Sequence, residues 1–376
     1  MRPRILICGC IAQKAGQAGH TWQYLQYLLG FARLGYDVLL WDRLQGTVGR
    51  EDRRIAYLQA VMEEFGLAGR WSVALDDGTH AGLPRNAVLE HARTADLLLN
   101  VMGYCSEPEL LDASRLRVFL DTDPGFGQMW KALELADVFA GHDVHVTIGE
   151  RIAAADCTIP ECGIRWIVSP QPVVLDAWPA LPPPSGELRF TSVASWRGAY
   201  GPVHFDGRRY GLRVHQFRRF SDLPLLTDAR FELALAIDPA EEAESAGLRD
   251  RGWALVDPAS VAATPSGYRD YLQASSAELM VAKGMYVDSR SGWFSERSIC
   301  YLASGRPVLA QDTGLGDLYP TGSGLVTFSS LDEAVAGVDA IRRDYDRHAR
   351  AARQLAEECF GSEVVLKRLL REVGVA

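Results

Sequence analysis

A glycine-containing turn, a helix and a short strand follow one another near the end of the chain, in an order suited to holding an anion. Residues 290–314 read RSGWFSERSICYLASGRPVLAQDTG. Ser295 is placed to cap a helix with Glu296 in its first turn, and Gly305 is placed to end it. The apolar strand that follows ends in a loop at residues 312–314. Helix N-termini and loops at strand ends bind phosphates through backbone amides, so this stretch predicts a nucleotide-diphosphate site.

A histidine near the start of the chain has the position of a general base. His20 follows a small-residue loop after the first predicted strand, residues 4–10, and precedes a predicted helix. Asp121 and Asp123 follow another predicted strand and lie at the same edge of the sheet. A carboxylate there can orient the imidazole and stabilise the imidazolium that forms. We expect one of the two aspartates to support His20. The alternative is that His20 is a structural residue at the start of the helix that only forms a hydrogen bond with a neighbour.

The two aspartates also form a D-x-D pattern, which raises a metal-dependent alternative. Two closely spaced carboxylates, here Asp121 and Asp123, can hold Mg²⁺ or Mn²⁺. The pattern lies in the first half of the chain, whereas the predicted diphosphate site lies far downstream, so we expect no metal. The seven cysteines are an odd number without zinc-ligand spacing, as in reduced cytoplasmic proteins.

Length and charge limit what the chain can be. Its 376 residues exceed one ordinary core, so we expect two domains. The net charge of -9 argues against non-specific nucleic-acid binding, which needs clustered cations. We find no export signal and no apolar run long enough to span a membrane, so we expect a cytoplasmic protein.

Predicted strands and helices alternate along both halves of the chain, which is the pattern of doubly wound parallel sheets. Prolines between residues 170 and 184 interrupt the alternation and predict an extended linker. We therefore expect a first domain over residues 1–178, a second over residues 179–360, and a C-terminal helix within residues 361–376. A basic, aromatic segment at residues 207–220 is expected to be a solvated face or an interdomain contact, with binding of an anionic acceptor as the alternative.

Two runs, GWFSER at residues 292–297 and YLASGRPV at residues 301–308, resemble the donor-binding segment of two-domain (GT-B) glycosyltransferases. The resemblance implies two Rossmann-like domains facing across a cleft, with a UDP, TDP or GDP sugar held mainly by the second domain and the acceptor by the first. It also implies metal-independent transfer without a cofactor, and a C-terminal helix that crosses back to the first domain. The family's usual ribose-binding glutamate falls at Cys300 here, so Glu296, one turn earlier, is the glutamate available.

Carried onto this sequence, the resemblance implies inverting transfer in which His20 removes the acceptor proton. Lys283 would offset the charge that builds up on the departing diphosphate. Gly19, Trp22 and His142 are expected to line the acceptor pocket. The expected donor-binding residues are Ser195, Arg197, Lys283, Ser291, Gly292, Trp293, Phe294, Ser295, Glu296, Arg297, Asp312, Thr313 and Gly314.

Other functions fit the same residues. A retaining transferase of the same fold is the nearest alternative, although its usual two spaced glutamates are absent around Glu296. A nucleotide-sugar epimerase would convert the nucleotide sugar without an acceptor. A non-catalytic binding module would convert it neither with an acceptor nor without one. Aromatic residues of the first domain are compatible with a flat or apolar small-molecule acceptor such as a natural product. The protein could form a homodimer. Neither nucleic acid nor a membrane is an expected partner.

Overall fold

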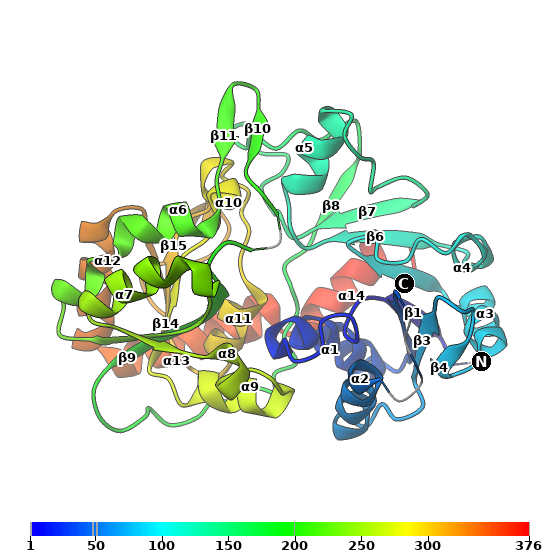
Figure 1. The fold of residues 1–376 in the computed structure, drawn as a ribbon, viewed down its shortest axis with the longest axis horizontal. Helices are drawn as coiled ribbons and strands as arrows, with labels where there is room; N and C mark the ends of the chain where they lie inside the picture. The colour runs from blue at the N-terminus through cyan, green and yellow to red at the C-terminus, as the bar shows by residue number, and fades with distance from the viewer. Residues whose placement is uncertain (1, 47–48, 50–51, 199, 376) are drawn as a thin grey trace.

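Two α/β units, each built on a largely parallel sheet, make up the chain (Figure 1). The computed structural model describes residues 2–46, 49, 52–198 and 200–375. The predicted alternation of strands and helices is confirmed in both halves. Among the described residues, no helix combines the length and the apolar character needed to cross a bilayer.

Within the described residues, the first sheet has eight strands in the order β4-β3-β2-β1-β5-β6-β7-β8. They are β1 (Arg4–Cys8), β2 (Asp37–Leu44), β3 (Trp71–Leu75), β4 (His80–Gly82), β5 (Leu97–Val101), β6 (Arg117–Asp121), β7 (Val144–Thr147) and β8 (Trp166–Val168). The helices are α1 (Ala18–Arg33), α2 (Arg53–Glu64), α3 (Arg85–Thr94), α4 (Pro108–Ala113) and α5 (Phe126–Ala132). Only β3 and β4 pair antiparallel among the described neighbours.

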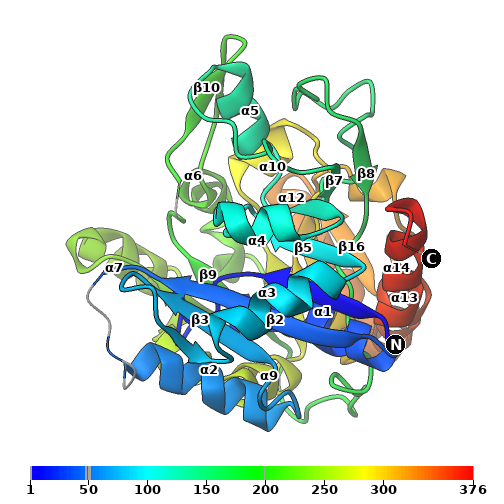
Figure 2. The same ribbon diagram turned by 90° about the vertical axis from the view of Figure 1, so that its right-hand side faces the viewer.

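Both faces of the first sheet are buried. Ile5 and Ile7 of β1 belong to the core shared with α1 and α2, whereas Leu6 and Cys8 belong to the core shared with α3. Figure 2 shows α2 and α3 on either side of the sheet. This is why its strands are continuous apolar runs and not alternating ones.

The second sheet has six described strands, all parallel, in the order β13-β12-β9-β14-β15-β16. They are β9 (Arg189–Ser195), β12 (Arg230–Ala236), β13 (Trp253–Val256), β14 (Ala277–Met280), β15 (Val308–Gln311) and β16 (Leu325–Phe328). A separate hairpin joins β10 (Val203–Phe205) to β11 (Arg208–Tyr210). The helices are α6 (Arg213–Phe217), α7 (Glu242–Asp250), α8 (Pro258–Val261), α9 (Pro265–Gln273), α10 (Gly284–Asp288), α11 (Glu296–Ala303), α12 (Leu331–Arg343), α13 (Tyr345–Leu355) and α14 (Ser362–Glu372).

The linker between the units and the returning C-terminal chain lie side by side. The linker, residues 169–188, contains neither helix nor strand. Val173 N donates to the Phe360 carbonyl at 2.7 Å, and the Val173 carbonyl accepts from Ser362 N at 2.8 Å. The chain then enters α14, which packs against α1 of the first unit (Figure 1).

An apolar core runs across the boundary between the units. The Trp22 ring of α1 lies 4.7 Å from the Trp178 ring of the linker, between centroids, and Trp178 lies 6.2 Å from Tyr268 of α9. Trp22 Nε1 donates to the Pro265 carbonyl at 2.9 Å. Burial of three large rings therefore holds the two units together on the α1 side.

Replacing Gly30 with valine should lower the free energy of unfolding by about 1–3 kcal/mol, because overpacking forces α14 away from α1. A Cβ at Gly30 would lie 2.4 Å from Leu366 Cδ1 and 3.1 Å from Ser362 Cβ. Gly247→Val in α7 is the matched control, since a Cβ there approaches only the end of the Arg251 side chain, at 3.4 Å. Urea unfolding of both variants measures the effect, and equal losses would contradict tight packing at Gly30.

Candidate active site

The carboxyl-terminal edges of the two sheets face each other, and their loops touch across the boundary. Lys283, after β14, donates from Nζ to both carboxylate oxygens of Asp123, after β6, at 2.9 Å each. The Tyr286 hydroxyl donates to the same carboxylate. Arg151 N, after β7, donates to the Ser291 carbonyl at 3.0 Å. Ligands of open α/β sheets bind at this edge, so the boundary is the candidate site.

The Lys283 ammonium lies among aromatic rings. Its Nζ is 5.0 Å from the ring centroid of Phe126, 5.2 Å from that of Tyr286 and 5.8 Å from that of Tyr200. The side chains of Lys283 and Asp123 are only 15% and 19% exposed. Burial lowers the pKa of Lys283, and the Asp123 carboxylate opposes that shift. The structure thus joins two predicted site residues, one from each domain, in a partly dehydrated ion pair.

A further cation at this edge, Arg213 at the start of α6, was not among the predicted site residues. Its Nε donates to the Val281 carbonyl at 3.1 Å, and its Nη1 donates to the Ser195 carbonyl at 3.3 Å. These carbonyls lie at the ends of β14 and β9, the neighbours at which the strand order of the sheet reverses. Burial lowers the pKa of Arg213 to about 10, and nearby Arg297 acts in the same direction. The basic segment 207–220 was the sequence signal, but it did not single out this arginine.

His20 lies in the first turn of α1, beside the loop that follows β1. Its Nε2 is 3.0 Å from the Cys10 sulfur, and its ring meets the Tyr24 ring edge-on, with 5.2 Å between centroids. Burial lowers the pKa of His20 to about 3, and the charge of Lys14 acts in the same direction. The imidazole is therefore neutral at physiological pH, as a proton acceptor must be. Sequence reasoning missed Cys10 and Lys14, although both lie in the loop after the first strand.

Asp121 makes its hydrogen bonds within the first domain. Its Oδ2 accepts from Gln128 Nε2 at 2.7 Å and from Thr147 Oγ1 at 2.9 Å, and its Oδ1 accepts from Asp123 N at 3.0 Å. Burial raises its pKa to about 6. Over the described residues, no cluster of three or more His, Cys, Asp or Glu side chains is arranged to hold a metal ion. Nor does the described structure show a hydrogen bond or ion pair from His20 to either aspartate, so the predicted pair is not formed here.

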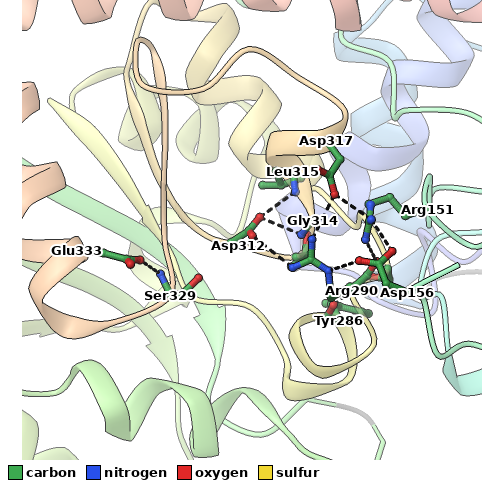
Figure 3. A network of polar contacts seen from close by, with 12 residues as sticks. Arg151, Asp156, Tyr286, Arg290, Asp312, Gly314, Leu315, Asp317, Ser329 and Glu333 are labelled. Atoms are coloured by element: carbon green, nitrogen blue, oxygen red, sulfur yellow. Dashed lines mark hydrogen bonds and ion pairs between the residues drawn. The ribbon is translucent and has the colours of Figure 1, made fainter. Parts of the chain in front are cut away.

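An arginine of the first domain fills the predicted glycine-rich turn. A Cβ at Gly292 would lie 2.8 Å from Arg151 Cγ, and a Cβ at Gly314 would lie 2.6 Å from Arg151 Cδ. Both glycines have positive φ, 72° and 98°. The Arg151 guanidinium pairs with Asp156 at 2.6 Å and with Asp317 at 2.8 Å (Figure 3). The close approach of Arg151 accounts for both glycines, and the phosphate contact of this turn stays a prediction.

The two predicted donor loops are tied to each other. Gly292 N donates to the Thr313 carbonyl at 2.8 Å, and Thr313 Oγ1 donates to the Trp293 carbonyl at 2.7 Å. The Trp293 ring stacks on Tyr286, with 4.3 Å between centroids. Asp312 Oδ1 accepts from two backbone amides of its own loop at 2.9 Å. The structure thus brings both loops together beside Tyr286, next to the ion pair.

Glu296, predicted to contact the ribose, faces the first domain. Its Oε1 accepts from Gln26 Nε2 at 3.2 Å and from the Cys300 thiol at 2.9 Å. Gln26 Oε1 in turn accepts from Val174 N at 2.8 Å. Burial raises the pKa of Glu296 to about 7. One carboxyl oxygen, Oε1, is therefore engaged at the domain boundary, and the ribose contact stays a prediction.

The neighbours of Glu296 in the predicted donor segment also contact protein groups. Arg297 forms an ion pair with the fully buried Glu278 and donates to the Val193 carbonyl at 2.6 Å. Phe294 is buried in the core. Ser295 begins α11 at the N-cap position but makes no side-chain capping hydrogen bond.

The predicted acceptor residues are dispersed. Trp22 is fully buried, and the contact of its ring with an acceptor stays a prediction. His142 uses both ring nitrogens inside the first domain, with Nδ1 donating to the Phe139 carbonyl and Nε2 accepting from Asn100 Nδ2, both at 3.0 Å. Gly19 faces α9 so closely that a Cβ would lie 3.1 Å from a tyrosine ring.

Ser195 and Arg197 lie exposed at the carboxyl end of β9, where the sequence places them. The Arg197 guanidinium pairs with Glu241, with Nε 3.0 Å from both carboxylate oxygens. Ser195 contributes its carbonyl to Arg213. Neither side chain reaches the Lys283 and Asp123 pair through a hydrogen bond in the described structure.

Solved structures match nearly the whole chain. An alpha-glucosyltransferase in complex with UDP and a 13-mer DNA is 12% identical with a TM-score of 0.61, covering 99% of this chain and 100% of its own. Anabaena Alr3699/HepE in complex with UDP-glucose is 14% identical with a TM-score of 0.60, at 99% and 100% coverage. TarM of S. aureus, a G117R mutant in complex with Fondaparinux, alpha-GlcNAc-glycerol and UDP, is 9% identical with a TM-score of 0.63, at 100% coverage of both chains.

The chain has the GT-B fold. No family model and no curated protein matches its amino-acid sequence. At identities of 9% to 14%, the likeness to these structures is one of fold alone. The predicted GT-B architecture is confirmed, and the activity has to be argued from the residues at the boundary.

Replacing Arg297 with methionine should lower the free energy of unfolding by about 3–5 kcal/mol, because a buried charge loses its partner. Glu278 is fully buried, and one of its oxygens has no hydrogen-bond partner among the described residues. The double variant Arg297→Met/Glu278→Leu should recover most of that loss, since no unpaired charge remains. Urea unfolding of the single and double variants measures both values. A loss below about 1 kcal/mol in the single variant would contradict a structural ion pair.

The Cε1 proton of His20 should show no titration between about pH 5.5 and pH 8 in NMR spectra, because burial keeps its pKa near 3. The unfolded chain binds this proton at an ordinary pKa, so stability should fall as the pH drops from about 6.5 towards 3. His20→Gln should remove part of that fall. A titration midpoint near 6.5 would show that the ring is hydrated.

Proposed function

We propose that the protein is a glycosyltransferase that moves a sugar from a nucleoside diphosphate sugar to an acceptor hydroxyl, at the boundary between its two sheets. The observation that carries the proposal is the meeting of Asp123 and Lys283 where the carboxyl-terminal edges of both sheets face each other. A partly buried cation at this position supports binding of donor phosphates. The three matching GT-B structures hold UDP or UDP-glucose, which supports the same donor class.

In the proposed reaction, the acceptor oxygen forms a bond to the anomeric carbon while the bond from that carbon to the diphosphate oxygen breaks. The acceptor proton passes to a base, and the nucleoside diphosphate leaves with an added negative charge. Lys283 and Arg213 are the side chains placed to stabilise that charge.

His20 is the proposed base of an inverting reaction. It is neutral, and it lies beside the loop after β1, where the strand order of the first sheet reverses between β1 and β5. Its low pKa makes it a weak base in the closed arrangement. The proposal therefore requires that ligand binding hydrates the ring, which raises the pKa.

A retaining reaction is the second candidate. The names of two matching structures include an alpha-glucosyltransferase and alpha-GlcNAc-glycerol, and both concern alpha-linked sugars. The proton coupling constant at the anomeric carbon of the product, read by NMR, separates the two outcomes. A beta product from an alpha-linked donor supports inversion, and an alpha product supports retention.

The proposal predicts release of nucleoside diphosphate from a UDP, TDP or GDP sugar only when an acceptor alcohol is present. His20→Ala should lower the turnover number by about 10²–10⁴-fold and leave the melting-temperature rise with the nucleotide unchanged. His80→Ala is the matched control, because His80 is bonded to Ser72 at the far edge of the first sheet. It should keep full turnover.

Three results would count against parts of this proposal. Conversion of a nucleotide sugar without any acceptor would indicate an epimerase. A melting-temperature rise with nucleotide sugars but no turnover with any acceptor would indicate a binding module. Unchanged turnover in His20→Ala would show that His20 is not the base. The transferase assignment would then be tested by analysis of the product.

A further inference from the structure

The Lys283 ammonium is paired with an anion of the same chain. Asp123 reaches across from the first domain, and both of its carboxylate oxygens lie 2.9 Å from Nζ. The Tyr286 hydroxyl donates to the same carboxylate, and the rings of Phe126 and Tyr200 lie beside the ammonium. These contacts form a site for a negatively charged group, and a side chain of the same protein holds it here.

The pocket has more positive than negative charge. Arg213 is fixed to the carbonyls that end β9 and β14, so its charge is held at the same strand ends as Lys283. The pKa of Lys283 is affected by the charges of Arg213 and Asp123, and the pKa of Arg213 is affected by the charge of Asp123. One carboxylate therefore faces two cations, whereas a diphosphate would bring charge enough for both.

We propose that Lys283 and Arg213 form the binding site for the diphosphate of the donor, and that Asp123 fills this site in the empty protein as a tethered competitor. The inference rests on the proposed function and deepens it. To bind, the diphosphate displaces Asp123 from Lys283, which breaks an ion pair between the domains. Donor binding is then coupled to separation of the loops after β6 and β14. The more molecules have Asp123 in the site, the weaker the apparent affinity for the donor becomes.

The test is the dissociation constant of inorganic pyrophosphate and of UDP, measured by isothermal titration calorimetry on the full chain. Asp123→Asn should bind both about tenfold more tightly, because the competing charge is gone. Lys283→Gln should bind both at least about tenfold more weakly. Tyr286→Phe, which removes one of the hydrogen bonds that hold Asp123, should bind about two- to threefold more tightly. This variant keeps the charge pair, so it tests the idea even if Asp123→Asn folds poorly.

Asp156→Asn is the matched control. Asp156 of the first domain pairs with Arg290 of the second at 2.7 Å, and with Arg151, in the network of Figure 3. The variant thus removes a carboxylate that pairs across the same boundary but makes no contact with Lys283. Its pyrophosphate affinity should stay within about twofold of that of the unaltered protein.

Tighter pyrophosphate binding by Asp123→Asn, with unchanged binding by Asp156→Asn, supports the competitor. Unchanged or weaker binding by both Asp123→Asn and Tyr286→Phe would overturn it. Equal tightening in Asp156→Asn would overturn it too, since any loosening of the boundary would then suffice. Undiminished binding by Lys283→Gln would overturn the site itself. Pyrophosphate binding needs neither a sugar nor an acceptor, so these results stand apart from a failure of the transfer assay.

Discussion

Taking charged groups out of water is costly, and the boundary between the two sheets contains charges at several points. Lys283 and Asp123 are mostly buried, and Arg297 and Glu278 are more so. Replacing a buried ion pair with apolar residues is often neutral or stabilising, so such a pair adds little to stability by itself. The Lys283 pair also lies at the strand ends of both sheets, where ligands of this architecture bind. The location of this ion pair is easier to explain by ligand binding than by a stabilising role.

The two domains are held together by contacts of different kinds at different places. Near the linker the contacts are apolar, with Trp22 against Trp178, and α14 returns to pack on α1. At the strand ends they are polar, and the network around Arg151 and Arg290 is partly exposed (Figure 3). Exposed ion pairs contribute little and are screened by salt, whereas buried rings resist separation. We therefore expect the contacts at the strand ends to break more readily than those near the linker, where the segments at Val173 are also paired.

Glycines in this chain show how one pattern can serve two purposes. The turn was predicted to contact a diphosphate, and the structure shows another group of the same chain close to Gly292 and Gly314. The group that approaches is Arg151, from a part of the chain more than a hundred residues away. Sequence reasoning supplied a phosphate because phosphates are frequent partners of such turns. The contact with Arg151 could not be read from local sequence, and the phosphate contact stays a prediction.

The alternation of apolar strands and helices was sufficient to predict two doubly wound units and the strand ends at which Asp123 and Lys283 lie. The reason is that a parallel sheet buried on both faces requires continuous apolar strands, which are visible in the sequence. Which side chains meet was decided only by the tertiary structure. Glu296 and Trp22 lie on helix faces that the other domain covers, and Asp121 is bonded to Gln128 of α5 and Thr147 of β7. Arg213 reaches the strand ends from the start of α6, which follows the hairpin β10–β11. Local sequence specifies the direction and burial of each element. The contacts between elements depend on how two rigid sheets are set against each other, and packing across a boundary leaves no periodic trace in either partner.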